Sequence, residues 1–162
     1  MIPGPSLKAR ALRLLAQREH SRAELMRKLA PHTDDEALLV AALDDLEAKG
    51  FIDEGRVAES VLHRRAARLG ATRVRGELQA KGLSVAVVDD AVQQLRHTER
   101  DRAAAVWARK FGQPPADAKA RAQQMRFLAA RGFAPEAIRQ VVPRVAPRHG
   151  DDDLSDAQDG EG

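Results

Sequence analysis

Large aliphatic residues recur along the chain with the spacing that amphipathic helices require. Leu78, Val88 and Val92 are separated by ten and then four positions, and the same spacing occurs 50 residues later and 49 residues earlier. The two further triads are Leu128, Ile138 and Val142, and Leu29, Leu39 and Leu43. A period of this length is typical of stacked helical repeats. The pattern therefore predicts one helical unit that is written three times.

Another apolar position precedes each triad by about one helix and completes the predicted core of each unit. These positions are Leu12, Val61 and Phe111. Alternation with a period of two residues is not sustained anywhere, so no strand is predicted. We expect an all-α fold of three tandem three-helix repeats, similar to helix-turn-helix units, that stack into an elongated, curved molecule.

Residues with helix-capping chemistry delimit the helices within each unit. Ser21 and Glu24 have the spacing of a capping box, and Thr33 and Glu36 repeat it. Glycine ends helices because it adopts the left-handed conformation without a steric penalty, and it occurs where ends are expected, at Gly50, Gly82 and Gly132. We predict helices over residues 6–18, 21–30, 34–48, 53–69, 71–81, 84–95, 99–110, 117–131 and 135–146.

The repeat and the composition together divide the chain into four segments. The first repeat is expected over residues 6–52, the second over 53–97 and the third over 98–146. Residues 147–162 form an acidic tail. Its stretch 149–162 contains six acidic residues and no Lys or Arg, which is a composition typical of disorder.

The net charge of +3 hides an uneven distribution of charge along the chain. Without the six acids of the tail, 27 basic residues stand against 18 acidic ones. Residues 6–55 contain 8 basic and 10 acidic residues, residues 56–82 contain 7 and 2, and residues 100–148 contain 11 and 3. An anionic partner is therefore expected at the middle and the end of the chain.

Catalytic chemistry is not indicated by the residue types present. The absence of cysteine excludes disulfides, thiolate nucleophiles and zinc–thiolate sites. The five histidines include no pair at metal-ligand spacing on one helix, and no glycine-rich phosphate-binding motif occurs. We expect a protein that is not an enzyme and that holds neither a cofactor nor a metal.

No targeting or membrane segment is predicted either. The N-terminal stretch "MIPGPSLKAR" lacks the apolar region of a signal peptide. Apolar runs such as residues 37–43 are too short to cross a bilayer. We expect a cytoplasmic protein without a membrane partner.

The basic residues of the second and third repeats are the candidates for binding. Part of their charge is expected to be paired internally, since Arg73, Glu77 and Lys81 are spaced as an outward ladder on one helix. The excess beyond such pairing predicts a surface that binds phosphates without reading sequence. The candidate basic set is Arg64, Arg65, Arg68, Arg73, Arg75, Lys81, Lys110, Arg121, Arg126 and Arg131.

Aromatic stacking on bases is not predicted, because the few aromatic residues occupy periodic apolar positions. They are Phe51, Trp107, Phe111, Phe127 and Phe133, and we expect them in the core. Recognition of single-stranded bases needs exposed aromatic rings, so sequence-specific reading of nucleic acid is not expected.

Four stretches, in their order and spacing, resemble the RecX family, the regulatory proteins of the bacterial recombinase RecA. They are "HSRAELMRKL" (20–29), "LEAKGFIDEGRVAES" (46–60), "RVRGELQAKGL" (73–83) and "KFGQPPADAKARAQQMRFLAARGF" (110–133). The resemblance covers about residues 8–146. It implies three tandem three-helix repeats, in agreement with the periodicity.

The resemblance also implies a function in DNA repair, recombination and the SOS response. RecX-type proteins bind the RecA–DNA filament, usually suppress its ATPase and strand exchange, and bind single- and double-stranded DNA weakly. Their basic middle and C-terminal repeats are thought to face the filament groove. On this chain, that implies a contact role for Arg64, Arg65, Arg68, Arg73, Arg75, Lys81, Arg126 and Arg131 in a monomeric protein.

Two hypotheses remain open from the residues alone. The chain either modulates RecA filaments or is a non-specific DNA-binding helix-turn-helix repeat protein without recombinase contact. The acidic tail lies outside the resemblance, and we hypothesise that it competes with DNA for the basic face.

Overall fold

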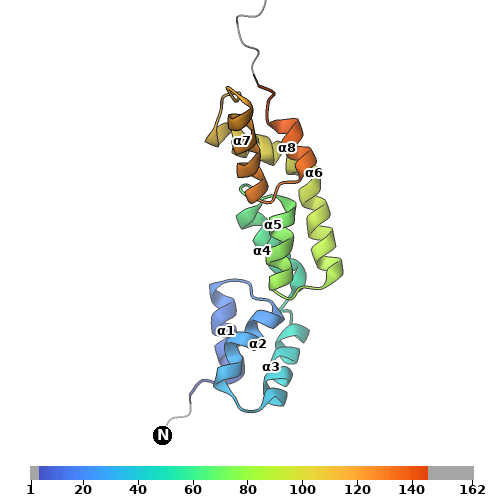
Figure 1. Cartoon of the computed structure of the whole chain (residues 1–162). Coiled ribbons are helices and arrows are strands. Elements are labelled where there is room, and N and C mark those ends of the chain that lie inside the picture. Colours follow the sequence, from blue (N-terminus) through green and yellow to red (C-terminus); the bar gives the residue numbers. More distant parts are fainter. Residues whose placement is uncertain (1–3, 146–162) are drawn as a thin grey trace, which may run out of the picture.

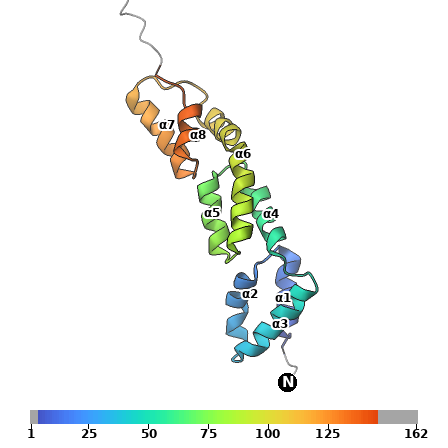
Figure 2. The ribbon, with the colours of Figure 1, turned by 90° about the vertical axis from the view of Figure 1, so that its right-hand side faces the viewer.

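The computed structural model describes residues 4–145, which form a succession of helices without a strand. Figures 1 and 2 show an elongated molecule whose first and last described residues lie at opposite ends. The elements are α1 (Leu7–Gln17), α2 (Arg22–Leu29), the 3-10 turn η1 (Ala30–His32), α3 (Glu36–Ala48), α4 (Glu54–Arg65), α5 (Ala71–Ala80), α6 (Val85–Lys110), α7 (Ala118–Ala130) and α8 (Pro135–Val141). The predicted all-α repeat fold is confirmed.

Three separate hydrophobic cores follow one another along the molecule. The first core lies among α1, α2 and α3, the second among α4, α5 and the first half of α6, and the third among the second half of α6, α7 and α8. All nine positions of the three aliphatic triads are buried in these cores. Burial of such side chains drives the packing of each unit, so the spacing in the sequence identified the core residues correctly.

The apolar position predicted ahead of each triad is correct only in the second core. Val61 is buried there, but Leu12 is 37% exposed and Phe111 is half-buried. In the first core α1 turns Ala11 inward instead, and in the third core α6 supplies Ala103 and Val106 from a continuous helix rather than from a separate one. The prediction that Phe51 lies in the core is also wrong, since 46% of its surface is exposed.

Helix α6 replaces the two helices predicted over 84–95 and 99–110. The intervening Arg96, His97 and Thr98 include neither glycine nor proline, so nothing local ends the helix. Buried residues continue through this point at helical spacing, from Leu95 to Glu99. The predicted boundary between residues 97 and 98 therefore lies inside α6, which contributes to the second and third cores.

Two predicted helices are shorter than expected. The helix predicted over 53–69 ends at Arg65, and the following residues form turns. The helix predicted over 135–146 ends at Val141. Pro143 explains the second difference, because the residue before a proline is disfavoured in the helical conformation and Val142 is extended, with a ψ of 118°.

Capping follows the sequence signals at most helix ends. The Ser21–Glu24 capping box is formed at the start of α2. The Thr33–Glu36 box is not formed, because Asp35 caps α3 by accepting hydrogen bonds from the N–H groups of the two residues that follow Glu36. The three predicted helix-ending glycines have φ values of 81°, 73° and 85°, at Gly50, Gly82 and Gly132.

No helix within residues 4–145 is both long and apolar enough to span a membrane. In the same range, no group of three or more His, Cys, Asp or Glu side chains is arranged to hold a metal ion. The predicted acidic tail over 147–162 lies outside the described residues.

Candidate partner-binding surface

Three residues of the candidate basic set converge on one hollow at the boundary between the second and third cores. Arg68, Lys110 and Arg131 line it together with Arg109, Val106 and Phe127, and its volume is about 370 Å³. We refer to this site as the basic hollow. Four of its six lining residues are cationic and none is acidic, so it attracts anions and repels cations.

Two of the four cations of the basic hollow, Lys110 and Arg131, lie at the ring of Phe127. The Lys110 ammonium lies 5.4 Å from the ring centroid and the Arg131 guanidinium lies 4.7 Å from it, both within the range of cation–π attraction. Phe111 packs edge-on against the same ring at 5.4 Å between centroids. This packing orders these two cationic groups before any ligand arrives, which lowers the entropic cost of binding.

Arg109 is the residue of the hollow that is absent from the candidate basic set. Its guanidinium donates a hydrogen bond to the carbonyl oxygen of Ala67, at 3.2 Å, in the turn that carries Arg68. The sequence signal was its position beside Lys110 in the last turn of α6. Its convergence with Arg68 depends on the packing of α6 against α4, which no local pattern in the sequence specifies.

Arg102 is a second residue that sequence reasoning missed, and it positions the turn after α4. Its guanidinium donates hydrogen bonds to the carbonyl oxygens of Ala66, Leu69 and Leu95 and lies 5.9 Å from the ring centroid of Phe133. This side chain binds the carbonyls of Ala66 and Leu69, at the end of α4 and in the turn after it, and also that of Leu95 inside α6, so it joins these backbone segments. The backbone that carries Arg68 is thereby tied to α6.

The hollow keeps its positive charge because its cations are not neutralised. Among residues 4–145, none of the ion pairs involves Arg68, Arg109, Lys110 or Arg131. Elsewhere in the second repeat the predicted basic face is partly paired. Arg65 lies 3.3 Å from Glu77, and Arg75 lies 3.2 Å from Asp89.

The predicted ladder of Arg73, Glu77 and Lys81 is not formed, because tertiary partners compete for all three side chains. Glu77 pairs with Arg65 on α4. Arg73 donates a hydrogen bond to the carbonyl oxygen of Ala130 at the end of α7, at 2.9 Å. Arg64 is exposed and its guanidinium bonds only within α4, to the carbonyl oxygen of Ser60.

Neighbouring units of the molecule meet at two junctions. Arg73 belongs to the second of them, where the end of α7 meets the start of α5. The N–H of Gly70 donates to the carbonyl oxygen of Arg131 at 2.8 Å, and the N–H of Thr72 donates to that of Gly132 at 3.3 Å. The free N–H groups of one helix thus satisfy the free carbonyls of another. A Cβ atom on Gly70 would collide with the backbone of Gly132, so the contact requires glycine.

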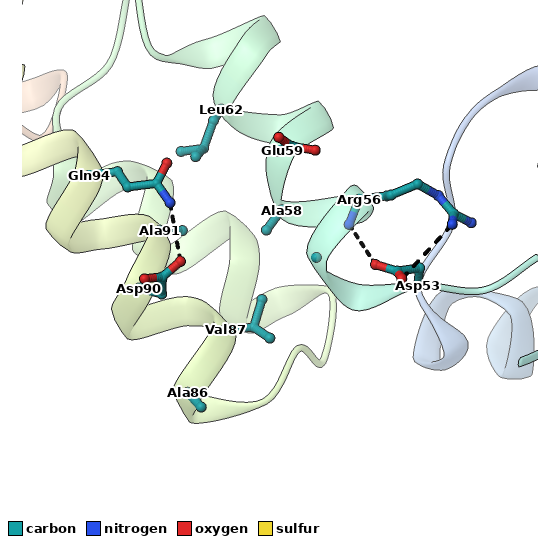
Figure 3. Close-up of a pocket in the computed structure, with 11 residues that line it drawn as sticks. Asp53, Arg56, Ala58, Glu59, Leu62, Ala86, Val87, Asp90, Ala91 and Gln94 are labelled. Atoms are coloured by element: carbon teal, nitrogen blue, oxygen red, sulfur yellow. Dashed lines mark hydrogen bonds and ion pairs between the residues drawn. The ribbon is translucent and has the colours of Figure 1, made fainter. Parts of the chain in front are cut away.

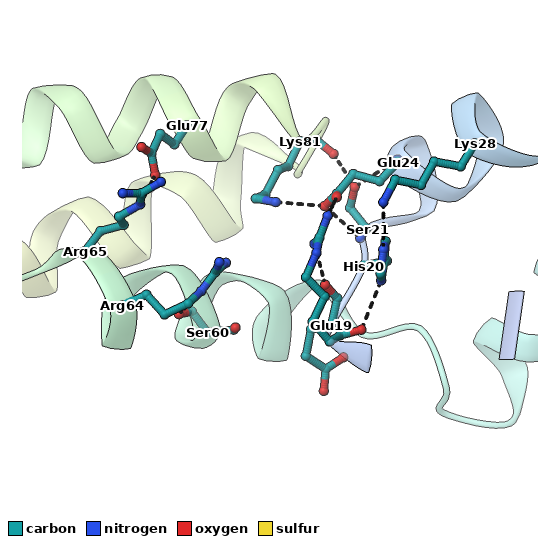
Figure 4. A network of polar contacts seen from close by, with 11 residues as sticks. Glu19, His20, Ser21, Glu24, Lys28, Ser60, Arg64, Arg65, Glu77 and Lys81 are labelled. Carbon is teal, nitrogen blue, oxygen red and sulfur yellow. Dashed lines mark hydrogen bonds and ion pairs between the residues drawn. The ribbon is translucent and has the colours of Figure 1, made fainter. Parts of the chain in front are cut away.

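Lys81 belongs to the first junction, between α2 of the first core and the end of α5 (Figure 4). Its ammonium lies 3.0 Å from Oε1 of Glu24, and the Arg18 guanidinium lies 2.7 Å from Oε2. The Ser21 hydroxyl donates to the carbonyl oxygen of Lys81. Burial alone would raise the pKa of Glu24, but the hydrogen bonds from Arg18, Lys81 and the Ser21 N–H outweigh it and lower the pKa to about 2.

His20 lies on the first-unit side of this junction as a neutral ring. Its Nε2 lies 3.1 Å from the Lys28 ammonium, and its Nδ1 lies 2.9 Å from the carbonyl oxygen of Arg18. An ammonium group only donates, so Nε2 accepts and Nδ1–H donates to the carbonyl. Burial lowers the pKa of His20, in agreement with this assignment.

The remaining members of the candidate basic set lie outside the hollow. The Arg121 guanidinium donates a hydrogen bond to the carbonyl oxygen of Pro143 at 3.3 Å. Arg126 is exposed on α7. The structure therefore separates the candidate basic set into four groups. They are the cations of the hollow (Arg68, Lys110 and Arg131), those paired on the surface (Arg65 and Arg75), those that join neighbouring units (Arg73 and Lys81) and those that lie apart (Arg64, Arg121 and Arg126).

A larger groove lies between α4 and α6, with a volume of about 520 Å³ (Figure 3). Its carboxylates are Asp53, Glu59 and Asp90. The single cation, Arg56, is already paired with Asp53 and with Glu19, which lies between α1 and α2. The groove therefore repels phosphates and is not the site that the charge distribution predicts.

Comparisons with known proteins agree on one family. A family model described as "RecX, third three-helix domain" matches residues 98–142. The "Regulatory protein RecX" of Leptothrix cholodnii is 54% identical over 151 residues, which are 93% of this chain and 96% of the relative. That of Ralstonia nicotianae is 49% identical over 137 residues, which are 85% of this chain and 86% of the relative.

Solved structures are similar in fold. The crystal structure of RecX from Lactobacillus salivarius matches with a TM-score of 0.70 and 18% identity, over 83% of this chain and 91% of the solved one. A second structure, "Crystal structure of regulatory protein RecX", matches with a TM-score of 0.67 and 20% identity, over 83% of this chain and 70% of that one.

Proposed function

The chain belongs to the RecX family of regulatory proteins, and from this premise we propose that it binds the RecA–DNA filament and inhibits ATP hydrolysis and strand exchange by the filament. In this proposal the protein acts by contact and not by catalysis. It works as a monomer in the cytoplasm, with weak and non-specific affinity for single- and double-stranded DNA.

The observation that carries the proposal is the basic hollow. Four cations converge there without a neutralising carboxylate within residues 4–145, and the nucleic-acid phosphates of a filament are anions that such a site binds. Such a site accelerates encounter with an anionic partner, and its affinity falls as salt rises. The elongated arrangement of three cores (Figure 2) supports the proposal further, because an extended molecule has the length to contact more than one subunit of a helical filament.

The test is the rate of single-stranded-DNA-dependent ATP hydrolysis by RecA with this protein added well below the recombinase concentration. We expect strong suppression, because too little protein is present to cover the DNA competitively. Full RecA activity, together with intact binding to bare DNA, would favour a DNA-binding protein without recombinase contact.

Charge-reversal variants connect the activity to the hollow. Arg68→Glu and Lys110→Glu should weaken suppression severalfold, because each replaces a cation of the hollow with an anion that repels an anionic partner. The fold should be retained, since both side chains are exposed and neither makes a bond that joins neighbouring units. Arg27→Glu is the matched control, since it changes net charge equally on an exposed position of α2. Arg73 and Lys81 are poor probes, because their replacement would also disturb the junctions that they hold.

A further inference from the structure

The basic hollow lacks a counter-charge within residues 4–145, whereas the end of the same chain carries a concentrated run of carboxylates. We propose that the acidic segment over residues 149–162 binds in the basic hollow of its own chain and competes there with the partner. The binding stands on the charges and the geometry, whereas the competition rests on the proposed function.

Charge complementarity identifies this segment as the occupant. Residues 149–162 contain six acidic residues without a Lys or Arg, and three of the acids, Asp151 to Asp153, are consecutive. Carboxylates accept charge-assisted hydrogen bonds from guanidinium and ammonium groups, which the hollow presents from α6, α7 and the turn after α4. The groove between α4 and α6 would repel the segment, because Asp53, Glu59 and Asp90 lie along it (Figure 3).

The length of chain beyond the last described contact is sufficient. The carbonyl oxygen of Pro143 accepts a hydrogen bond from Arg121, and Arg121 lies six residues before Phe127 on α7. Six residues of helix rise by about 9 Å, and the helix with its side chains is about 10 Å wide. Beyond the last described residue, Val145, the eight residues 146–153 extend over as much as about 26 Å. Asp151 to Asp153 can therefore reach the hollow even when the chain passes around α7.

Attachment to the same chain favours this occupant over a free acidic peptide. A tethered segment has an effective concentration in the millimolar range at a site within its reach, so a modest intrinsic affinity is enough for binding. The contact is electrostatic and solvent-exposed, so it is screened as ionic strength rises. Partner binding is then expected to require displacement of the segment.

The absence of native cysteine makes a direct test possible in the full chain. A nitroxide spin label on Ser155→Cys, beside the three consecutive aspartates, broadens the backbone amide signals of residues near it. We expect broadening that is concentrated at Arg68, Lys110 and Arg131, and severalfold recovery of those signals in high salt. Broadening that is absent, or spread evenly over the three cores, would overturn the proposal.

Charge variants in the labelled chain locate the contact. Lys110→Glu, and the triple replacement of Asp151, Asp152 and Asp153 by Asn, should each restore the signals. Arg27→Glu should leave the broadening unchanged, because its net charge equals that of Lys110→Glu but its position lies in the first core's helix α2. Broadening that persists in Lys110→Glu would contradict binding at the hollow.

The competition is measured separately with RecA. The triple Asn variant should suppress RecA-dependent ATP hydrolysis at a severalfold lower concentration than the native chain. Equal suppression by both would contradict the competition. The spin-label experiment contains no recombinase, so failure of the proposed function leaves its result unaffected.

Discussion

Glu24 is the residue on which the first junction depends. Its carboxylate accepts from Arg18 in the first unit and from Lys81 in the second, and it also completes the capping box with Ser21. Removal of one partner from a buried ion network leaves the others with desolvated charge. We predict that Glu24→Gln lowers the free energy of unfolding at neutral pH by about 2–4 kcal/mol. Glu59→Gln, at an exposed position of α4, is the control.

The pH dependence of this loss follows from the direction of the pKa shift. The pKa of Glu24 is lowered from its ordinary value of 4.5 to about 2, so the ionised form stabilises the fold fully above the ordinary value. That stabilisation is lost as pH falls toward 2, because the unfolded chain takes up the proton first. Urea denaturation of the native chain and of Glu24→Gln between pH 7 and pH 2 should show that the difference between their free energies of unfolding narrows as pH falls. A difference that stays constant would contradict the ionic role of Glu24.

Several local residue roles were predictable from the sequence, although the Thr33–Glu36 capping box is not formed, and the long-range roles were not predictable. The capping box at Ser21 and the left-handed glycines follow from spacing within a few residues, and both are present. The bond from Lys81 to Glu24 joins residues that are 57 positions apart. Its existence depends on how two units pack, and in the sequence Lys81 was equally compatible with a solvent-exposed ladder.

At the scale of elements, α6 is the main difference between the predicted and the observed helices. The repeat favoured a break at residues 96–98, because each unit was expected to contain three short helices of its own. Nothing in the local sequence opposes continuation, and Glu99 is buried where its carboxylate accepts from the N–H of Ala71 at the start of α5. A helix start that has no capping side chain of its own thereby gains one from α6.

Thr98→Pro distinguishes the two descriptions of α6. Within a continuous helix proline removes a backbone hydrogen bond and collides with the preceding turn, which costs about 3 kcal/mol or more. In the alternative description Thr98 precedes the separate helix predicted over 99–110, where no intrahelical hydrogen bond of its N–H would be lost, so proline would be tolerated. Because α6 is continuous, we expect Thr98→Pro to lower the free energy of unfolding by about 3 kcal/mol or more and to reduce the far-ultraviolet circular dichroism signal of the helices. Thr98→Ala, which removes only the hydroxyl that bonds Arg102 and Leu95, should show little of either effect.

At the scale of the whole molecule, the two junctions are built differently. The first is held by side-chain bonds around Glu24 and by the pairing of Arg56 with Glu19. The second is held by the continuous helix α6 and by backbone bonds between α7 and α5. Ion pairs are weakened by salt and by protonation, whereas a continuous helix is not. The second and third cores therefore form the more rigid pair, with the basic hollow at their boundary.

The set of residues that converge in the basic hollow could be predicted only in part from the sequence. The excess of positive charge after residue 55 was visible in the composition, and Arg68, Lys110 and Arg131 were among the candidates. Their convergence, and the inclusion of Arg109, required the packing of α6 and α7 against the turn after α4. Arg73 and Lys81 have the same charge and comparable positions in the sequence, but tertiary contacts direct them to the junctions.

Small-angle X-ray scattering measures the shape on which the filament proposal depends. A compact chain of 162 residues would have a radius of gyration of about 15 Å. Three cores in series require a clearly larger value, and the forward scattering should give the mass of a monomer. Glu24→Gln should broaden the distance distribution, because it loosens the first unit and leaves the pair joined by α6 intact. A radius near 15 Å for the native chain would contradict the extended arrangement, and an unchanged distribution in the variant would show that Glu24 does not hold the first junction.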